Sequence, residues 1–235
     1  MNFYTVLALL ALIVVTPPLI FITIGWSFFQ HTGNGPHLIA RLWGRLILAC
    51  SLVKLNVIGR EHLDPKGTYV FAANHSSMFD ILVLLACLPV QFRWLAKEEL
   101  FRIPFFGRAM RRCGYIPVNR SDPREGVRSL RQAAERIKAG VSVVVFPEGT
   151  RSLDGQIGPF KQGGIILAVR AGQPIVPVSI SGAHRVLPSH SLRVRPGPIK
   201  VVIDNPIPTA GLGRTAQDEL TEQVRERIIA NHDPL

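Results

Sequence analysis

The hydrophobic positions divide the chain into an uninterrupted apolar start and a longer region where strand-like and helix-like patterns alternate. Residues 3–29 are almost wholly apolar and have no polar face. About 20 apolar residues can span a membrane, but Pro17-Pro18 divides this run, and proline interrupts helical hydrogen bonding. The pattern predicts a kink or break there, giving either one kinked span or a helical hairpin that enters one leaflet. A buried helix of a soluble domain is the third alternative.

The next segment, Leu38 to Val57, is amphipathic. Its apolar face comprises Leu42, Leu46, Ala49 and Val53, and Arg41 and Arg45 lie off that face. This spacing predicts a helix that lies either at a membrane interface or, with equal weight, in a protein core. We therefore expect membrane-embedded and interfacial helices over residues 1–57 and a globular domain over residues 58–235.

From residue 67 onward, β-branched or apolar runs alternate with helical patterns. Strands are predicted at residues 68–73, 91–96, 115–118, 141–146, 175–180, 192–195 and 199–203. Helices are predicted at residues 79–88, 104–112, 123–139, 164–170 and 216–230. Asp122 is the expected N-cap of the third of these helices, with Glu125 completing a capping box. The alternation predicts an α/β domain whose largely parallel or mixed sheet is flanked by helices.

Charge changes this picture in two ways. The chain has 235 residues, 47% of them hydrophobic, and a net charge of +11, which excludes a disordered protein. Residues 1–40 contain no charged side chain, and the basic residues that follow favour the cytoplasmic side of a membrane, the inner membrane in a bacterium. The stretch from Arg93 to Lys138 carries +7, which suits an anionic membrane or a phosphorylated substrate. Nucleic acid is disfavoured, because no aromatic-studded or zinc-finger pattern is present.

The first candidate for chemistry follows the strand predicted at residues 68–73. His75 and Asp80 are five residues apart, so they do not share a helix face. They can meet if His75 lies in the loop and Asp80 in the first turn of the next helix. A carboxylate on one imidazole nitrogen leaves the other nitrogen as a general base. The alternative is a histidine near a helix cap formed by Ser76 or Ser77.

The second candidate follows the apolar strand at residues 141–146. Gly149 permits a tight turn with exposed backbone donors, and Arg151 offers a bidentate fork for phosphate. Lys161 adds a further cation nearby. The alternative is an ordinary β-turn with a solvated arginine. The chain lacks a G-x-S-x-G elbow, a P-loop, a G-x-G-x-x-G fingerprint and metal-ligand spacings, so no metal or nucleotide cofactor is expected.

Four blocks in order resemble the glycerophospholipid acyltransferase family, and most closely its 1-acyl-glycerol-3-phosphate acyltransferases. The blocks are His75 with Asp80 (H-x4-D); Gly114, Ile116 and Arg120; Phe146 to Arg151; and Ile175 to Pro177. The likeness covers roughly residues 50 to 205. It implies transfer of an acyl group from acyl-CoA or acyl carrier protein to the sn-2 hydroxyl of 1-acyl-glycerol-3-phosphate, giving phosphatidic acid.

The resemblance also implies roles for individual residues. His75 is expected to be the general base, with Asp80 orienting it. Arg120 and Arg151 are expected to bind the acceptor phosphate, with Lys97 and Lys161 assisting. The remaining substrate-binding candidates from the blocks are Gly114, Glu148, Gly149 and Thr150. Glu148 is also open to a second interpretation, in which it holds its turn by pairing with a cation.

Other functions remain open at this point. The same chemistry could act on glycerol-3-phosphate, a lyso-aminolipid or another lysophospholipid, since these acceptors share the H-x4-D block. A non-catalytic lipid-binding protein of the membrane surface is a rival of another class, disfavoured by the intact His-Asp pair. A hydrolase is disfavoured by the missing nucleophile elbow.

Overall fold

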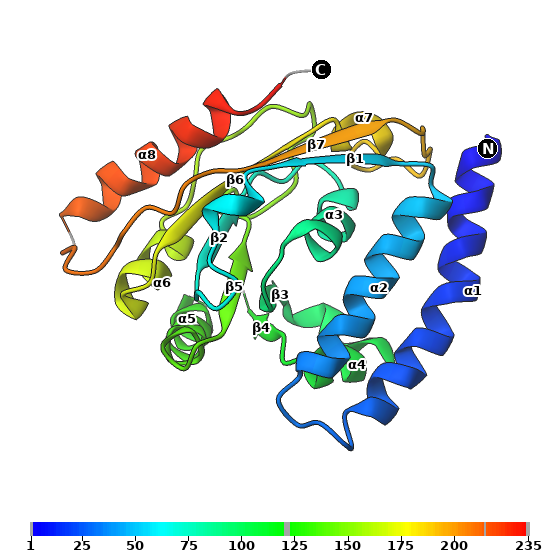
Figure 1. The fold of residues 1–235 in the computed structure, drawn as a ribbon, viewed down its shortest axis with the longest axis horizontal. Coiled ribbons are helices and arrows are strands. Elements are labelled where there is room, and N and C mark those ends of the chain that lie inside the picture. Colours follow the sequence, from blue (N-terminus) through cyan, green and yellow to red (C-terminus); the bar gives the residue numbers. More distant parts are fainter. Residues whose placement is uncertain (1, 120–122, 214, 234–235) are drawn as a thin grey trace.

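A seven-stranded sheet with strand order β1-β7-β6-β2-β5-β3-β4 forms the centre of the computed structural model, which describes residues 2–119, 123–213 and 215–233 (Figure 1). The strands are β1 Lys54–Ile58, β2 Val70–Ala73, β3 Phe92–Lys97, β4 Ile116–Val118, β5 Ser142–Val145, β6 Ile175–Ser181 and β7 Pro198–Ile203. Neighbouring strands pair in parallel except β6 and β7, which pair antiparallel. The mixed α/β class predicted from the pattern is confirmed.

Helices cover both faces of this sheet. They are α1 Phe3–Trp26, α2 Asn34–Cys50, α3 Phe79–Cys87, α4 Phe106–Arg112, α5 Pro123–Lys138, α6 Gly163–Ala171, α7 Ala183–Val186 and α8 Ala216–Ala230. One core, which includes Phe71 and Leu84, lies on the side of α2 and α3; the other, which includes Val70 and Val224, lies on the side of α5, α6 and α8. Because both faces are covered, β2, β5 and β6 are buried along their whole length.

Most predicted elements of the domain are present, with two corrections. Residues 192–195 do not form a strand; the backbone of Val194 instead binds Asn2 and Thr5 at the start of α1. The helix predicted over residues 38–57 is wrong at its end, because α2 stops at Cys50 and β1 pairs with β7 from Lys54 onward. The capping interactions predicted for Asp122 and the Glu125 side chain lie outside the part of the chain that is described.

The apolar start forms one helix and not two arms. Helix α1 runs unbroken through Pro17-Pro18, so the predicted break is wrong. The chain reverses over residues 27–33, and α2 returns alongside α1, where Trp43 Nε1 donates a hydrogen bond to Thr16 Oγ1 at 3.0 Å. Ala8 and Ala11 before the prolines and Thr23 after them are buried, so the helix packs against the rest of the protein on both sides of Pro17-Pro18.

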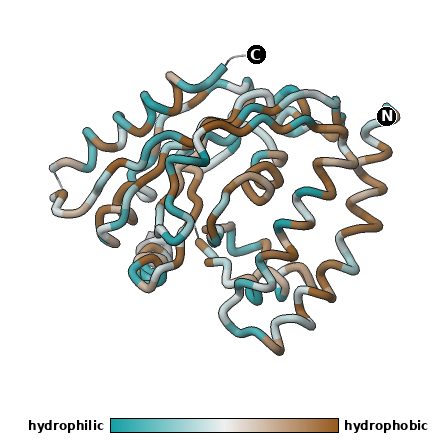
Figure 2. The backbone as a smooth tube through the Cα atoms, in the orientation of Figure 1, coloured by the Kyte–Doolittle hydropathy of each residue, from teal (hydrophilic) through white to brown (hydrophobic). Residues whose placement is uncertain are grey.

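Most of α1 faces outward. The mean hydropathy of its most apolar 18-residue segment is 2.6, and only 17% of that segment is buried. The alternative of a buried helix is therefore wrong. By length and composition the helix could cross a membrane. Figure 2 shows this hydrophobic helix at the edge of the molecule, away from the sheet.

Helix α2 connects this apolar helix to the domain. Arg41, which the pattern placed off the apolar face, donates hydrogen bonds to the carbonyl oxygens of Leu85 (3.2 Å) and Leu88 at the end of α3. Leu42 and Leu46 are exposed instead. The apolar face read from the spacing therefore points outward, as an interfacial helix requires, while the opposite face packs on α3.

Candidate active site

The predicted catalytic residues follow β2, and most of the predicted substrate-binding residues follow its neighbour β5. Strands β2 and β5 are parallel neighbours, so the loops that follow Ala73 and Val145 lie side by side. The backbone N–H of Ser152 donates a hydrogen bond to the carbonyl oxygen of His75 at 2.8 Å, which ties the two loops directly. This is the edge of an open α/β sheet at which ligands usually bind.

His75 and Asp80 meet as their spacing predicted. His75 lies in the loop and Asp80 in the first turn of α3, and His75 Nδ1 is 2.8 Å from Asp80 Oδ2. The same oxygen accepts hydrogen bonds from the backbone N–H groups of Ser76 (2.7 Å) and Ser77 (2.8 Å). The Asp80 side chain is fully buried, whereas the His75 side chain is 13% exposed. With Nδ1–H directed at the carboxylate, Nε2 is the nitrogen that can take a proton.

An aromatic stack fixes the plane of the imidazole. The ring of Phe146 is stacked on His75 with centroids 3.9 Å apart and an interplanar angle of 12°. Trp94 of β3 stacks behind Phe146 at 5.6 Å. His75 thus has its ring face supported by Phe146 and its Nδ1 held by Asp80, which leaves it little freedom to rotate. The sequence did not single out Phe146 or Trp94 for this role.

Glu148 holds the backbone of the loop that carries His75. Its Oε1 accepts a hydrogen bond from the backbone N–H of His75 at 2.7 Å, and its Oε2 accepts one from Gly158 at 3.3 Å. The side chain is buried, and this burial raises the pKa of the Glu148 carboxyl above its ordinary value. The turn is thus held by backbone N–H donors and not by the expected cation, at least among the described residues. Direct substrate contact by Glu148 stays a prediction.

Two further side chains hold the loop in place: Asn74, for which the sequence predicted no role, and Ser77, which it indicated only as a helix cap. Asn74 donates to the carbonyl oxygen of Ile180 (2.9 Å) and accepts from its N–H (2.7 Å), so it fastens the loop to β6. Ser77 Oγ donates to the carbonyl oxygen of Leu187 at 2.8 Å and accepts from the N–H of Phe79 at the start of α3. Ile180 and Leu187 lie more than 100 residues from Asn74 and Ser77 along the chain, so no local pattern reveals these two contacts.

Several predicted substrate-binding residues belong to the second loop, which joins β5 to α6. Gly149 has φ +78°, and a Cβ there would lie 3.0 Å from Lys161 Nζ, so the lysine packs directly over the turn. The backbone N–H of Lys161 donates to the carbonyl oxygen of Pro147 at 2.8 Å. Thr150 is exposed and Arg151 half-buried. The loop therefore gathers two cations, Arg151 and Lys161, beside His75, although their binding roles stay predictions.

The other predicted cations are more scattered. Lys97 lies at the carboxyl end of β3 and forms an exposed ion pair with Glu99 at 3.1 Å. Gly114 precedes β4, where its φ of +76° and the nearby Arg93 side chain account for a glycine. Arg120 lies outside the described residues. Their roles in substrate binding also stay predictions.

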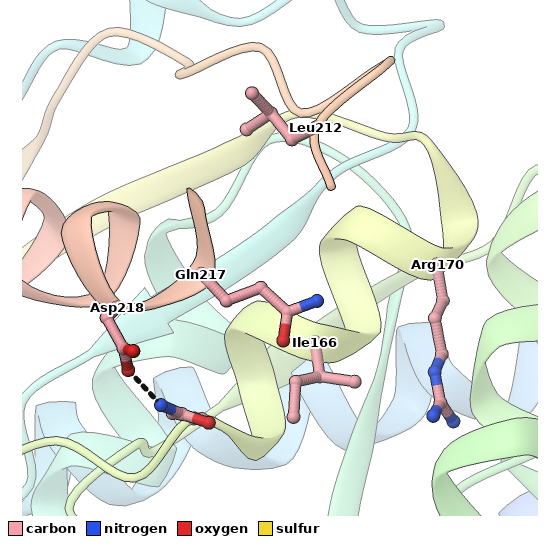
Figure 3. Close-up of a pocket in the computed structure, with 6 residues that line it drawn as sticks. Ile166, Arg170, Leu212, Gln217 and Asp218 are labelled. Carbon is pink, nitrogen blue, oxygen red and sulfur yellow. Dashed lines mark hydrogen bonds between the residues drawn. The ribbon is translucent and has the colours of Figure 1, made fainter. Parts of the chain in front are cut away.

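A shallow depression between α6 and α8 is separate from this site (Figure 3). Its lining residues are Gln162, Ile166, Arg170, Leu212, Gln217 and Asp218. A hydrogen bond joins Gln162 to Asp218 across it. None of the predicted site residues lines it, so we assign it no part in the chemistry.

Comparison with known proteins supports the family resemblance that the sequence motifs indicated. A family model described as "Acyltransferase" matches residues 54–181, which include His75, Asp80 and Arg151. The chain is 36% identical over 203 residues to a chloroplastic 1-acyl-sn-glycerol-3-phosphate acyltransferase of Brassica napus, covering 86% of this chain and 57% of that protein. It is 31% identical over 235 residues to the protein of that name from Chlamydomonas reinhardtii, covering 99% and 68%.

A solved structure is also similar along nearly the whole chain. The 1-acyl-sn-glycerophosphate (LPA) acyltransferase PlsC from Thermotoga maritima matches with a TM-score of 0.75 and 28% identity, covering 96% of each chain. By contrast, the present chain spans little more than half the length of the two plant relatives from Brassica napus and Arabidopsis thaliana. The family match includes both catalytic loops and the strands that carry them, and the chain therefore belongs to the acyltransferase family.

Proposed function

We propose that this protein transfers a fatty acyl group from a thioester to the sn-2 hydroxyl of 1-acyl-sn-glycerol-3-phosphate, giving phosphatidic acid for phospholipid synthesis. The observation that carries the proposal is the contact of 2.8 Å between His75 Nδ1 and Asp80 Oδ2, in a chain whose relatives are named for this reaction. Either acyl-CoA or acyl carrier protein could supply the acyl group, and the reaction needs no further cofactor.

The proposed reaction proceeds by general base catalysis. Nε2 of His75 takes the proton of the acceptor hydroxyl as its oxygen attacks the thioester carbonyl carbon. The tetrahedral intermediate collapses, the C–S bond breaks, and the departing thiolate takes the proton from the imidazolium. Asp80 stabilises that imidazolium and keeps Nε2 directed at the substrate. General base catalysis of this kind typically contributes about 10²- to 10⁴-fold.

The cations of the second loop are the residues that we propose to bind the acceptor phosphate. Arg151 and Lys161 lie on the loop that is hydrogen-bonded to His75 through Ser152. No ion pair within the described residues occupies the Arg151 guanidinium, so it is available for a bidentate contact with phosphate. Arg151→Ala should raise the KM for the acceptor while the KM for the thioester changes little. The opposite pattern would contradict this assignment.

The exposed apolar surface of α1 supports a membrane location for the site. Ile13, Val14 and Phe21 are 58–68% exposed. A helix of 24 residues is about 36 Å long, enough for a hydrocarbon core of about 30 Å. An enzyme that rests on the bilayer avoids extracting its lipid acceptor into water, which costs about 0.8 kcal/mol per exposed CH₂ group.

Both ends of α1 are attached to the α/β domain, which favours insertion into one leaflet. At the amino end, Asn2 Nδ2 and Thr5 Oγ1 bond the backbone of Val194. At the other end, Phe21 packs on Phe105 with ring centroids 5.6 Å apart. A perpendicular span would draw the polar loops at one of these ends into hydrocarbon, where exposed loops are not tolerated. We therefore infer that α1 and α2 form a hairpin within one leaflet, on the cytoplasmic side.

A panel of acceptors and donors tests the proposed reaction. Purified protein in detergent micelles is incubated with an acyl-CoA or an acyl carrier protein thioester and with 1-acyl-glycerol-3-phosphate, glycerol-3-phosphate or a lyso-aminolipid. We expect phosphatidic acid to form at least tenfold faster than any other product. Preference for another acceptor would correct the substrate, thioester loss without an acceptor would indicate a hydrolase, and no turnover with any pair would indicate a lipid-binding protein.

A further inference from the structure

The segment between α7 and β7 is bound to the start of the apolar helix. Val194 is 5% exposed, and both of its backbone polar groups bond to α1 residues: its N–H donates to Thr5 Oγ1 at 2.9 Å, and its carbonyl oxygen accepts from Asn2 Nδ2 at 2.9 Å. This attachment joins residues 194 and 5, far apart in sequence, at the end of the helix proposed to enter the bilayer. Residues next to Val194 are therefore held beside the membrane-facing surface.

The side chains around Val194 are basic and apolar. Leu192 is 78% exposed, and Arg193 and Arg195 are also exposed. Neither guanidinium has an ion-pair partner within the described residues. Residues 155–203 contain six lysines and arginines and no aspartate or glutamate, so no carboxylate in this whole stretch is available to neutralise them.

We propose that Leu192, Arg193 and Arg195 form a second membrane contact that binds the headgroups of anionic phospholipids. This proposal rests on the membrane location proposed above. An exposed leucine next to two arginines that have no ion-pair partner among the described residues matches an interface where acyl chains meet phosphates. The exposed side chains of Phe3 and Tyr4 lie between Asn2 and Thr5, the two α1 residues that bond Val194, and a water-soluble acidic partner would not require this apolar surface.

This contact determines how the molecule is oriented on the membrane. The opposite end of α1 lies beside α4, whose Arg108 and Arg111 are exposed, with Arg111 over the ring of Phe101 at 5.7 Å. Headgroup contacts at both ends of a helix about 36 Å long hold its axis along the membrane plane. The contact at Arg193 and Arg195 thus fixes the tilt of the protein, and with it the height of the His75 site above the lipid.

Vesicle binding tests the contact. The variant R193Q/R195Q is compared with wild type for flotation with phosphatidylcholine vesicles and with vesicles containing 30% phosphatidylglycerol, at 0.1 M and 0.5 M salt. Since each basic residue near an anionic surface contributes about fivefold in affinity, we expect about 25-fold weaker binding to the anionic vesicles at low salt. Binding to the neutral vesicles should be unchanged, and the difference should shrink at high salt.

The control variant is R170Q, which removes an exposed arginine from α6 beside the depression of Figure 3. It should bind both vesicles like wild type. Unchanged binding of R193Q/R195Q to anionic vesicles, or an equal loss in R170Q, would overturn the proposal. A raised KM for an acyl carrier protein donor with normal vesicle binding would also overturn it and assign the patch to that protein.

Two further measurements distinguish a loss of membrane binding from a loss of folding or of catalysis. The thermal unfolding temperature of R193Q/R195Q should equal that of wild type, since only backbone atoms of this segment bond to α1. Its turnover of substrates in neutral detergent micelles should also be unchanged. If micellar activity is absent from wild type as well, the proposed reaction fails independently of the membrane contact.

Discussion

The Glu148 carboxylate accepts a hydrogen bond of 2.7 Å from the backbone N–H of His75, so an acid in one loop fixes the backbone of the base in the other. Its second oxygen binds the N–H of Gly158. A buried acid in this place acts by positioning, because its contacts reach the backbone of His75 and not the imidazole.

Replacing Glu148 should therefore lower kcat more than it raises KM. Glu148→Ala leaves two N–H groups without an acceptor, and we expect kcat to fall about 100-fold, equivalent to about 2.7 kcal/mol. Glu148→Gln keeps one acceptor oxygen and should retain more activity than the alanine variant. Steady-state kinetics in micelles measure both; equal loss in the two variants, or a loss confined to the acceptor KM, would point to direct substrate contact instead.

Arg93 holds the hairpin to the catalytic sheet. This arginine of β3 is 2% exposed and donates hydrogen bonds to the carbonyl oxygen of Thr32 (3.2 Å) and to Asn34 Oδ1 (2.6 Å), at the turn between α1 and α2. Truncating it removes charge-assisted bonds typically contributing about 1.5–3 kcal/mol.

We expect Arg93→Ala to lower the free energy of unfolding by about 3 kcal/mol. Asn34→Ala, which removes one bond at an exposed position, should cost about a third of that. Arg111→Ala is the matched control, because Arg111 is exposed and contacts only the ring of Phe101 among the interactions described. Denaturant unfolding in detergent gives the three values, and equal costs for Arg93 and Arg111 would show that the buried contact is unimportant.

The chain end makes stability depend on pH through His232. Its Nδ1 lies 3.3 Å from Ser181 Oγ at the end of β6, and burial lowers the pKa of His232 below its ordinary value of 6.5. The unfolded chain therefore takes up a proton as the pH falls through 6.5, whereas the folded chain resists it, and stability is lost below that pH.

His232→Gln should remove this contribution. When the pH is lowered from 7.5 to 5.5, the unfolding temperature of wild type should fall by more than that of the variant. The buried His37 is present in both proteins, so its own titration cancels in the comparison. A difference that stays constant across this range would show that His232 is not protonated on unfolding.

The sequence predicted the parts of the site that depend on local geometry. A loop histidine and a carboxylate in the next helical turn are five residues apart, and their meeting follows from that spacing. Glu148, Asn74 and Phe146 act through contacts across 70 or more residues, which strand order alone determines. Their residue types were visible, but their partners were not.

The function of the charged residues was the hardest feature to predict from the sequence. Arg93 and Arg136 belong to the stretch of charge +7, yet Arg93 is buried against the hairpin turn and Arg136 donates to the carbonyl oxygen of Gly114 at 2.6 Å. Part of the excess charge is therefore structural. The unbroken α1 has a similar cause, because its packing in the fold, including the hydrogen bond from Trp43 of α2 to Thr16 beside Pro17-Pro18, outweighs the local preference of proline for a break.

The most direct test of the account is the rate of acyl transfer by His75→Ala in detergent micelles, measured with an acyl thioester and 1-acyl-glycerol-3-phosphate. We expect turnover to fall by at least about 10²- to 10⁴-fold. The unfolding temperature should stay near that of wild type, since the backbone bonds of His75 to Glu148 and Ser152 remain. A folded variant with near wild-type turnover would contradict the assignment of His75 as the general base.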